Sequence, residues 1–407
     1  MTHDTNIPHG YKATALGIIP QEWEVRPLNY LGAICSGGTP DTEVAEYWNG
    51  DIAWCTPSDI TKLDTKYIES TEVKITAKGL KESSASLLPP RSIVVCTRAT
   101  IGNAAICNTE IATNQGFKNI IPNEKTNPEW LYYIIIYSKP RLVRLGCGST
   151  FLEVSKKDFS RFKIAVPPLA EQRKIAEVLG VWDEAIEKQA RLIEKLALRK
   201  RALMQRLLSA KLRLPGFSEP WKTHKLQELF TERNETNRTD LPLLSITGDR
   251  GVILQTESEK RDTSNDDKSK YKRIAKGDIG YNTMRMWQGR SALSGLEGIV
   301  SPAYTIVVPN TDVDGYYMSV LFKQPRLIYD FWTHSQGLVG DTLNCKYRDF
   351  GQVHICCPPL AEQKAITEVL TAADREIELA KEKLERLRRQ KRGLMQQLLT
   401  GKKRVKY

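Results

Sequence analysis

The chain has 407 residues, of which 41% are apolar and 27% are charged. This length is enough for two to four domains, and the composition is that of a folded protein, which excludes a disordered chain. No apolar run approaches the roughly 20 residues that span a bilayer, and the first ten residues lack the pattern of a secretory signal. We therefore expect a soluble, cytoplasmic protein without a membrane partner.

Cysteine and histidine are not spaced for metal binding or catalysis. The eight cysteines form no C-x-x-C pair, Cys356 and Cys357 are adjacent, and the five histidines are scattered. There is no H-E-x-x-H motif, no Walker A loop, and no G-x-G-x-x-G after a predicted strand. The sequence therefore predicts no metal site, no catalytic residues and no cofactor on this chain.

The net charge of +12 is concentrated in two segments. Residues 190–215 carry eight Lys/Arg against one acidic residue, and residues 381–407 carry eleven against two. Two such segments favour a polyanionic partner such as nucleic acid. The alternative is that these cations complement helix C-termini and solvate the surface.

The first globular segment, residues 20–165, has short β-rich runs separated by Gly, Pro and Asn. Strands are predicted at Ser92–Cys96 and Asn119–Ile121, and a short apolar helix at Pro128–Ser138. This mixture predicts an α/β or α+β domain.

A long helix is predicted next. Apolar residues from Pro167 to Leu208 follow the alternating four- and three-residue spacing of a heptad seam. Such a helix extends about 60 Å, which is longer than a small domain needs, so we expect a spacer. The seam residues expected to pack against a partner helix are Leu179, Trp182, Ile186, Ile193, Leu196 and Leu203.

The second globular segment, residues 218–357, has the same mixed pattern as the first. A strand is predicted at Tyr304–Val308 and a short helix at Tyr316–Tyr329. It is followed by a second long helix with the seam residues Leu370, Ile377, Leu384, Leu387 and Leu394, which Gly401 is placed to end.

The two halves of the chain are copies of one unit. At an offset of 191 residues, 22 of the 42 residues from Pro167 to Leu208 are identical to Pro358–Leu399. Asp158 and Phe159 match Asp349 and Phe350 at the same offset. Trp23 and Trp221 also open the two halves alike. The long helices are thus the parts that stayed alike, and the globular segments have diverged.

This repeat predicts a four-part organisation. The expected parts are residues 1–166, 167–212, 213–357 and 358–407. Because a globular segment separates the two helices, we expect them to pair antiparallel, with pseudo-two-fold symmetry. Lys200 and Lys391 interrupt both seams at equivalent positions, by snorkelling or as register-setting residues.

Loops of both globular segments carry side chains suited to DNA. Arg can bind a guanine edge and Asn or Gln an adenine edge, whereas Lys, Ser and Thr suit phosphates. The alternative is that these loops are only solvated. The candidate DNA-binding residues are Gly38, Thr39, Arg98, Thr100, Gln115, Lys118, Lys272, Arg273, Asn282, Arg285, Trp287, Gln288 and Tyr304.

Several of these segments resemble a known family. The repeated Pro-Pro-Leu-Ala-Glu-Gln helices, which end in Leu-Met-Gln before a final Leu-Leu pair, resemble the repeats of type I restriction-modification specificity subunits. The resemblance covers essentially the whole chain. Further similar segments are Gly17–Trp23, Gly37–Pro40, Tyr47–Ile52, Asn282–Gly289 and Gly298–Tyr304.

The resemblance implies a bipartite reader of double-stranded DNA. Each globular segment would be a target recognition domain for one half of a split asymmetric site, and the helices would fix the gap. Two modification subunits would dock on the repeat, restriction subunits would join, and S-adenosylmethionine would bind the modification subunit.

Two other classes remain as alternatives. An adenine methyltransferase needs an Asp/Asn-Pro-Pro-aromatic motif, whereas Val166–Leu169 and Cys357–Leu360 lack both the polar residue and the ring. A coiled-coil scaffold is compatible with the heptads alone, but it does not need two divergent heads with polar loops. We therefore predict a non-catalytic DNA-binding subunit.

Overall fold

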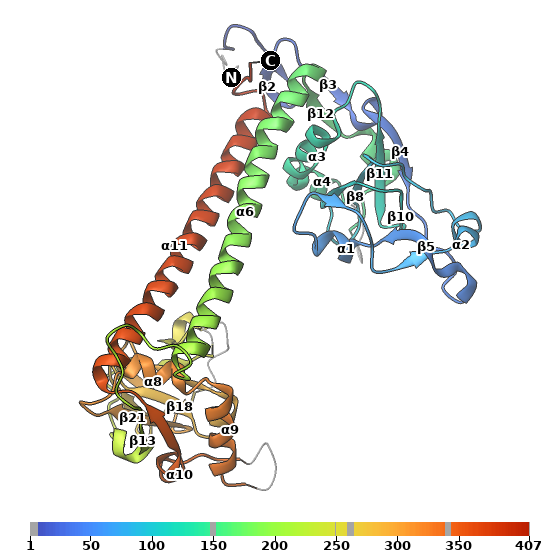
Figure 1. Cartoon of the computed structure of the whole chain (residues 1–407). Coiled ribbons are helices and arrows are strands. Elements are labelled where there is room, and N and C mark those ends of the chain that lie inside the picture. Colours follow the sequence, from blue (N-terminus) through green and yellow to red (C-terminus); the bar gives the residue numbers. More distant parts are fainter. Residues whose placement is uncertain (1–6, 147–151, 249, 259–263, 338–342, 407) are drawn as a thin grey trace. The chain divides into compact units, whose positions relative to one another are not determined.

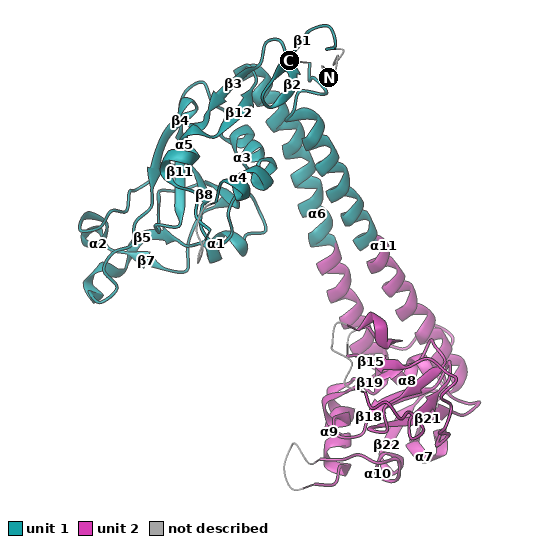
Figure 2. Cartoon of the chain, turned by 180° about the vertical axis from the view of Figure 1, so that it is seen from behind, with its two compact units in different colours: residues 1–192, 380–407 teal, residues 193–379 magenta. Residues whose placement is uncertain are grey.

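The computed structural model describes residues 7–146, 152–248, 250–258, 264–337 and 343–406 (Figure 1). The chain divides into two compact units (Figure 2). Unit 1 comprises residues 1–192 with 380–407, and unit 2 comprises residues 193–379. Each unit contains one globular head and about half of each long helix. The predicted architecture of mixed heads joined to two long helices is therefore confirmed.

The central sheet of the unit 1 head has the strand order β4-β11-β8-β9-β6. Neighbouring strands are antiparallel, except that β6 runs parallel to β9. The strands predicted at 92–96 and 119–121 are confirmed as β8 and β11. The bounds are β4 (Gly32–Ser36), β6 (Tyr67–Ile68), β8 (Ile93–Cys96), β9 (Ala104–Cys107) and β11 (Phe117–Pro122).

Helix α3 (Pro128–Tyr137) packs on this sheet, as predicted. It begins at Pro128 because the Asn127 side chain accepts a hydrogen bond from the Trp130 amide and a proline is tolerated in the first turn. Trp130 and Tyr133 are fully buried. The apolar pattern of this helix therefore reflects a buried face on the sheet.

The other elements of unit 1 surround this core. A second small sheet has the order β10-β5-β7, and β1–β2 and β3–β12 form antiparallel pairs. The bounds are β1 (Tyr11–Thr14), β2 (Gly17–Pro20), β3 (Glu24–Pro27), β5 (Trp48–Cys55), β7 (Lys74–Ile75), β10 (Ile111–Thr113), β12 (Lys163–Val166), α1 (Pro57–Thr61), α2 (Ala77–Lys81), α4 (Lys139–Leu145) and α5 (Lys156–Arg161).

The unit 2 head repeats the first sheet. Its strand order β14-β21-β18-β19 corresponds to β4-β11-β8-β9, and all neighbours are antiparallel. The strand predicted at 304–308 is confirmed as β21. The duplication seen in the sequence is therefore a duplication of the fold. The bounds are β14 (Phe230–Glu232), β18 (Ile279–Asn282), β19 (Ser291–Leu293) and β21 (Tyr304–Pro309).

The single helix predicted at Tyr316–Tyr329 is wrong. The structure has two helices there, α8 (Gly315–Leu321) and α9 (Pro325–His334). Gln324 is extended, with a ψ of 137°. A residue before a proline disfavours helical backbone, so Pro325 starts a new helix instead of continuing the first.

The remaining elements of unit 2 complete its head. β13 pairs with β22, β15 with β16 and β17 with β20, all antiparallel. The bounds are β13 (Lys222–Lys225), β15 (Leu244–Ile246), β16 (Val252–Leu254), β17 (Lys272–Ile274), β20 (Gly298–Val300), β22 (His354–Cys357), α7 (Leu226–Leu229) and α10 (Tyr347–Gln352).

The long helices are α6 (Leu169–Leu207) and α11 (Leu360–Leu398). They run antiparallel within each unit, because contacts pair rising numbers on α6 with falling numbers on α11. In unit 1 the Asp183 carboxylate binds Lys391, and the Gln189 amide donates to the Ala380 carbonyl at 2.9 Å. All eleven predicted seam residues are buried or half-buried, as packing against a partner helix requires.

The helices end in equivalent ways. Gly401 follows α11 with a φ of +71°, as predicted for a helix C-terminus. Ala210 takes the equivalent position after α6 with a φ of +55°. Among the described helices, none is long and apolar enough to cross a membrane.

The glutamate at the start of α6 holds three parts of unit 1 together. Glu171 is fully buried. It accepts a hydrogen bond from the Trp23 indole at 2.8 Å and two from the Arg404 guanidinium at 2.6 and 2.9 Å. The head, α6 and the segment after α11 therefore meet at one buried carboxylate.

Unit 2 contains an equivalent cluster in which α6 and α11 exchange roles. Here the glutamate lies at the start of α11, and the arginine lies in the segment after α6. Glu362 at the start of α11 is 1% exposed and accepts two hydrogen bonds from Arg213, at 2.6 and 2.8 Å. The Trp221 indole donates a third at 3.2 Å. Arg213 lies 191 residues before Arg404, so the repeat extends past the helices.

Candidate nucleic-acid interface

Three loops of the unit 2 head converge at one edge of its sheet. They follow β18, precede β21 and precede α10. Thr283 ties them together, because its amide donates to the Ala303 carbonyl at 3.0 Å and its carbonyl accepts from the Cys345 amide at 2.8 Å. Backbone hydrogen bonds therefore fix the relative positions of the three loops.

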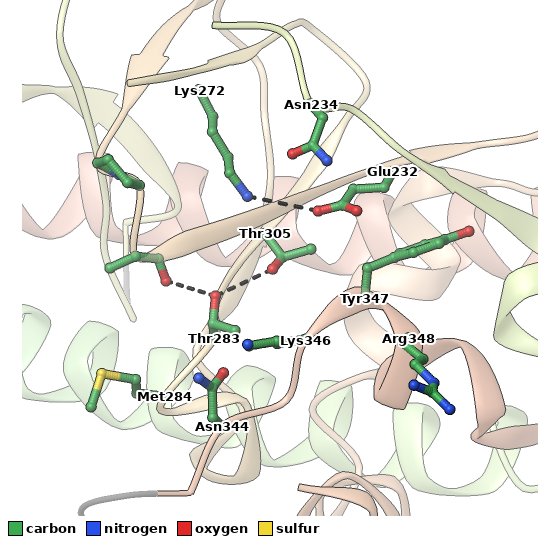
Figure 3. A pocket seen from close by; sticks show the side chains of 12 residues that line it. Glu232, Asn234, Lys272, Thr283, Met284, Thr305, Asn344, Lys346, Tyr347 and Arg348 are labelled. Carbon is green, nitrogen blue, oxygen red and sulfur yellow. Dashed lines mark hydrogen bonds and ion pairs between the residues drawn. The ribbon is translucent and has the colours of Figure 1, made fainter. Parts of the chain in front are cut away.

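A pocket of about 570 Å³ opens between these loops (Figure 3). Most of its lining side chains can donate or accept hydrogen bonds, and they come from segments more than 100 residues apart. The lining residues are Glu232, Asn234, Lys272, Thr283, Met284, Pro302, Ala303, Thr305, Asn344, Lys346, Tyr347 and Arg348.

The rim of this pocket is basic. Lys272 lies 3.7 Å from the Glu232 carboxylate, which neutralises it in part. Lys346 and Arg348 are exposed and have no ion-pair partner among the residues that the structure describes. Two unpaired cations on one rim suit a phosphate backbone.

Two further lining residues, Asn344 and Tyr347, are polar and uncharged. The Asn344 carboxamide oxygen is buried without a hydrogen-bond partner in the described part of the chain, and Figure 3 shows its side chain beside Thr283. Burial and the nearby Glu232 raise the pKa of Tyr347, whose hydroxyl donates to the Phe230 carbonyl at 2.7 Å.

The structure distributes the predicted unit 2 residues over this edge and its surroundings. Of these residues, Lys272 lines the pocket. Arg273 is held by the Glu235 and Glu297 carboxylates at 2.7 and 2.6 Å, and it follows Lys272 on the same strand. The Tyr304 hydroxyl lies 3.5 Å from the Ile246 carbonyl.

The other predicted unit 2 residues lie at the end of β18 and on the loop that follows it. Asn282 accepts a hydrogen bond from the Met284 amide at 3.1 Å, and the Trp287 indole donates to the Met284 carbonyl at 2.9 Å. Gln288 and Arg285 are exposed. Among the described residues, no side chain or carbonyl group forms an ion pair or hydrogen bond with the Arg285 guanidinium.

The unit 1 head has an equivalent edge. Its loops meet at Thr97, whose amide donates to the Gly116 carbonyl at 2.8 Å and whose carbonyl accepts from the Val154 amide at 3.0 Å. Val154 lies 191 residues before Cys345, which makes the same contact in unit 2. The two edges therefore correspond.

Four of the predicted unit 1 residues come together in pairs at this edge. Arg98 and Lys118 both contact the Glu153 carboxylate, at 2.9 and 3.5 Å. The Thr39 hydroxyl donates to the Gln115 side chain. The Thr100 hydroxyl is buried without a hydrogen-bond partner among the described residues.

Gly38 has a packing role at the same place. It is buried, and its carbonyl accepts from the Trp54 indole at 2.9 Å. A Cβ on Gly38 would lie 2.3 Å from the Ala85 amide nitrogen, so the backbone needs glycine here.

Replacing Gly38 by alanine is expected to lower the free energy of unfolding by about 1–3 kcal/mol, because the added methyl group overpacks the site. Gly393→Ala is the control in the same unit. A Cβ there meets nothing within 4 Å, and alanine favours the α11 helix. Chemical denaturation measures both, and equal stability of the two variants would contradict this assignment.

The sequence analysis did not single out four residues that line the pocket, Asn234, Asn344, Lys346 and Arg348. Lys157 is the counterpart of Arg348 at the offset of 191, directly before the matched Asp-Phe pair. That doubled basic position was the available signal. Within the described residues, no group of three metal-ligating side chains lies together.

Comparison with known proteins agrees with this architecture. The family model described as the type I restriction modification DNA specificity domain matches residues 20–197. The type I restriction enzyme MjaIX specificity subunit of Methanocaldococcus jannaschii is 39% identical over 193 residues, 46% of this chain and 45% of the relative. That alignment spans less than half of the relative's length.

A second relative aligns with nearly the whole length of this chain. The putative type I restriction enzyme MjaX specificity subunit of the same organism is 26% identical over 437 residues, 97% of each chain. The Escherichia coli EcoR124I/EcoR124II specificity subunit is 29% identical over 180 residues, 42% of this chain and 44% of the relative.

Solved structures share the fold. A chain from a study of the assembly and conformational transition of the type I R-M system has a TM-score of 0.61 at 18% identity, over 94% of this chain and 99% of that one. The S subunit from M. genitalium has a TM-score of 0.52 at 14% identity, over 98% of both chains. Residues 20–197 thus match the type I restriction modification DNA specificity domain, and the whole chain is similar to specificity subunits of type I restriction-modification systems.

Proposed function

We propose that this chain reads a bipartite, asymmetric site in double-stranded DNA, one half with each head, and has no catalytic role of its own. One observation carries the proposal. Each head places loops at the equivalent edge of its own central sheet. Those loops differ in sequence between the heads, whereas the order of the four corresponding strands is the same. Equivalent supports with different loops suit two different half-sites.

The partners follow from the duplicated helices. Two modification subunits dock on the two copies, and restriction subunits join that assembly. S-adenosylmethionine binds the modification subunit and not this chain. A solved structure with the same fold comes from a study of the assembly of a type I R-M system, which supports such docking.

Footprinting of the chain with its modification subunits tests the DNA site. We expect two protected segments on one face of the duplex, about one helical turn apart from centre to centre. A single continuous footprint, or none, would contradict bipartite reading.

The loop after β18 gives a second test. Replacing Arg285 by alanine is expected to relax the sequence of the half-site read by unit 2 and to leave the other half-site unchanged, because its exposed guanidinium has no partner in the described part of the chain. Selection from a library with both halves randomised measures this. Equal relaxation of both halves would place Arg285 outside base reading.

A further inference from the structure

Two lysines occupy seam positions of the long helices, Lys391 on α11 and its counterpart Lys200 on α6. Their side chains are only 16% and 20% exposed. A lysine in a heptad seam loses hydration, so its ammonium group needs a partner. The structure supplies the same kind of partner in both units.

In unit 1 the partner of Lys391 is Asp183 on α6. The other oxygen of Asp183 accepts a hydrogen bond from Tyr133 of α3. Lys66 also contributes, at 3.3 Å from Asp183 and 3.1 Å from the Tyr133 hydroxyl. Burial and Asp183 raise the pKa of Tyr133, so it remains a donor. This cluster joins both long helices to the head.

In unit 2 the partner of Lys200 is Asp374 on α11. The Tyr316 hydroxyl of α8 donates to the second oxygen of Asp374 at 2.6 Å. Asp374 is the counterpart of Asp183, and α8 follows the head sheet as α3 does. The Lys–Asp–Tyr arrangement therefore occurs twice, each time with the lysine and the aspartate on different helices.

Apolar contacts within the seam do not by themselves select one register for these helices. A slip of seven residues moves one helix by about 10.5 Å along the other and still pairs apolar with apolar positions. The same slip separates each lysine from its aspartate and leaves both groups partly buried without partners. Polar groups in a seam are known to specify register at a cost in stability.

We propose that each Lys–Asp–Tyr cluster sets the register of α6 against α11 and fastens the head to that register, so that the clusters determine which spacer between the half-sites is accepted. Other polar contacts are less suited to this role. Arg213 and Arg404 follow the helix ends, whereas the clusters lie on the helices themselves. The buried Gln189 side chain also lies on a helix, but it binds a backbone carbonyl of α11, a group that every residue of that helix carries. The spacer part of the proposal rests on the proposed function.

The unit 2 cluster offers a clean test. In the variant Lys200→Met/Asp374→Leu the unit 2 part of the seam loses its ion pair, and replacing a buried ion pair by apolar residues is often neutral or stabilising. We expect an unchanged or higher melting temperature. With its modification subunits, the variant should methylate sites whose spacer differs by about three base pairs at least tenfold more than the unmodified chain does, since three base pairs rise about 10.2 Å, close to the length of the seven-residue slip.

Two matched variants serve as controls for this experiment. Arg199→Met/Glu376→Leu removes a neighbouring interhelical pair whose side chains are 54% and 48% exposed, and it should keep a single spacer. The charge exchange Lys200→Asp/Asp374→Lys restores an ion pair and should restore the single spacer. Because the unit 1 cluster remains in Lys200→Met/Asp374→Leu, a fourfold variant also carries Lys391→Met/Asp183→Leu. A single spacer in the fourfold variant, or loss of selectivity in the exposed-pair control alone, would overturn the proposal.

A measurement without DNA separates the register from the proposed function. Spin labels at the exposed residues Leu198 and Leu379, both in unit 2, report the helix register by pulsed distance measurement on the full chain with Cys356 replaced by serine. We expect one distance in the native seam and additional distances in the fourfold variant. One unchanged distance overturns the register role, whereas failure of the native complex to methylate a two-part site overturns only the proposed function.

Discussion

Replacing Arg404 by methionine is expected to lower the free energy of unfolding of unit 1 by about 3–5 kcal/mol. Glu171 is fully buried and accepts two hydrogen bonds from this guanidinium. Without Arg404 the carboxylate keeps the Trp23 indole but loses its counter-charge inside the protein. A buried charge without a partner is far more costly than the pair is worth.

Chemical denaturation of the full chain measures this effect. Arg191→Met is the control, because Arg191 pairs with Glu187 one turn away on the helix surface, where such pairs contribute about 0.3–0.5 kcal/mol. The double variant Glu171→Gln/Arg404→Met removes the charge and still offers an acceptor to Trp23, so it should recover most of the stability. If Arg404→Met and Arg191→Met were equally stable, the buried cluster would not hold unit 1 together.

Replacing Lys346 and Arg348 together by alanine is expected to weaken DNA binding by the assembled complex at every sequence alike. Both cations lie on the rim of the unit 2 pocket without a partner among the described residues. Removing one cation that binds a phosphate should reduce the slope of log affinity against log salt by about one, so the double variant should reduce it by about two.

Lys276→Ala is the control for this experiment. Lys276 is an exposed cation of the same head, and it precedes β18, whereas the pocket lies beyond the other end of that strand. Titration with labelled duplex at several salt concentrations should show an unchanged slope for the control. A changed half-site sequence in the double variant, at an unchanged slope, would make these residues base readers instead of phosphate-binding residues.

The sequence predicted the elements whose pattern is local. The heptad seams of α6 and α11 follow from apolar spacing, and α3 follows from its short apolar run. The break at Pro325 was missed because a proline in the first turn of one helix and a proline inside a longer apolar run look alike in a sequence.

The sites were harder to predict because they are assembled from distant segments. The unit 2 pocket combines Asn234, Lys272 and Asn344, which no short motif connects. Glu171 and Arg404 are 233 residues apart, and only the doubled Arg213 and Arg404 at the repeat offset hinted at their role. Tertiary contacts of this kind become visible when the fold brings the segments together.

Genome-wide mapping of methylated adenines in a host that carries this chain with its modification and restriction subunits tests bipartite reading most directly. We predict one asymmetric motif with two defined halves, a fixed undefined spacer between them, and methylation that disappears when this chain is deleted. A continuous motif without a spacer, or methylation that persists without this chain, would contradict the account.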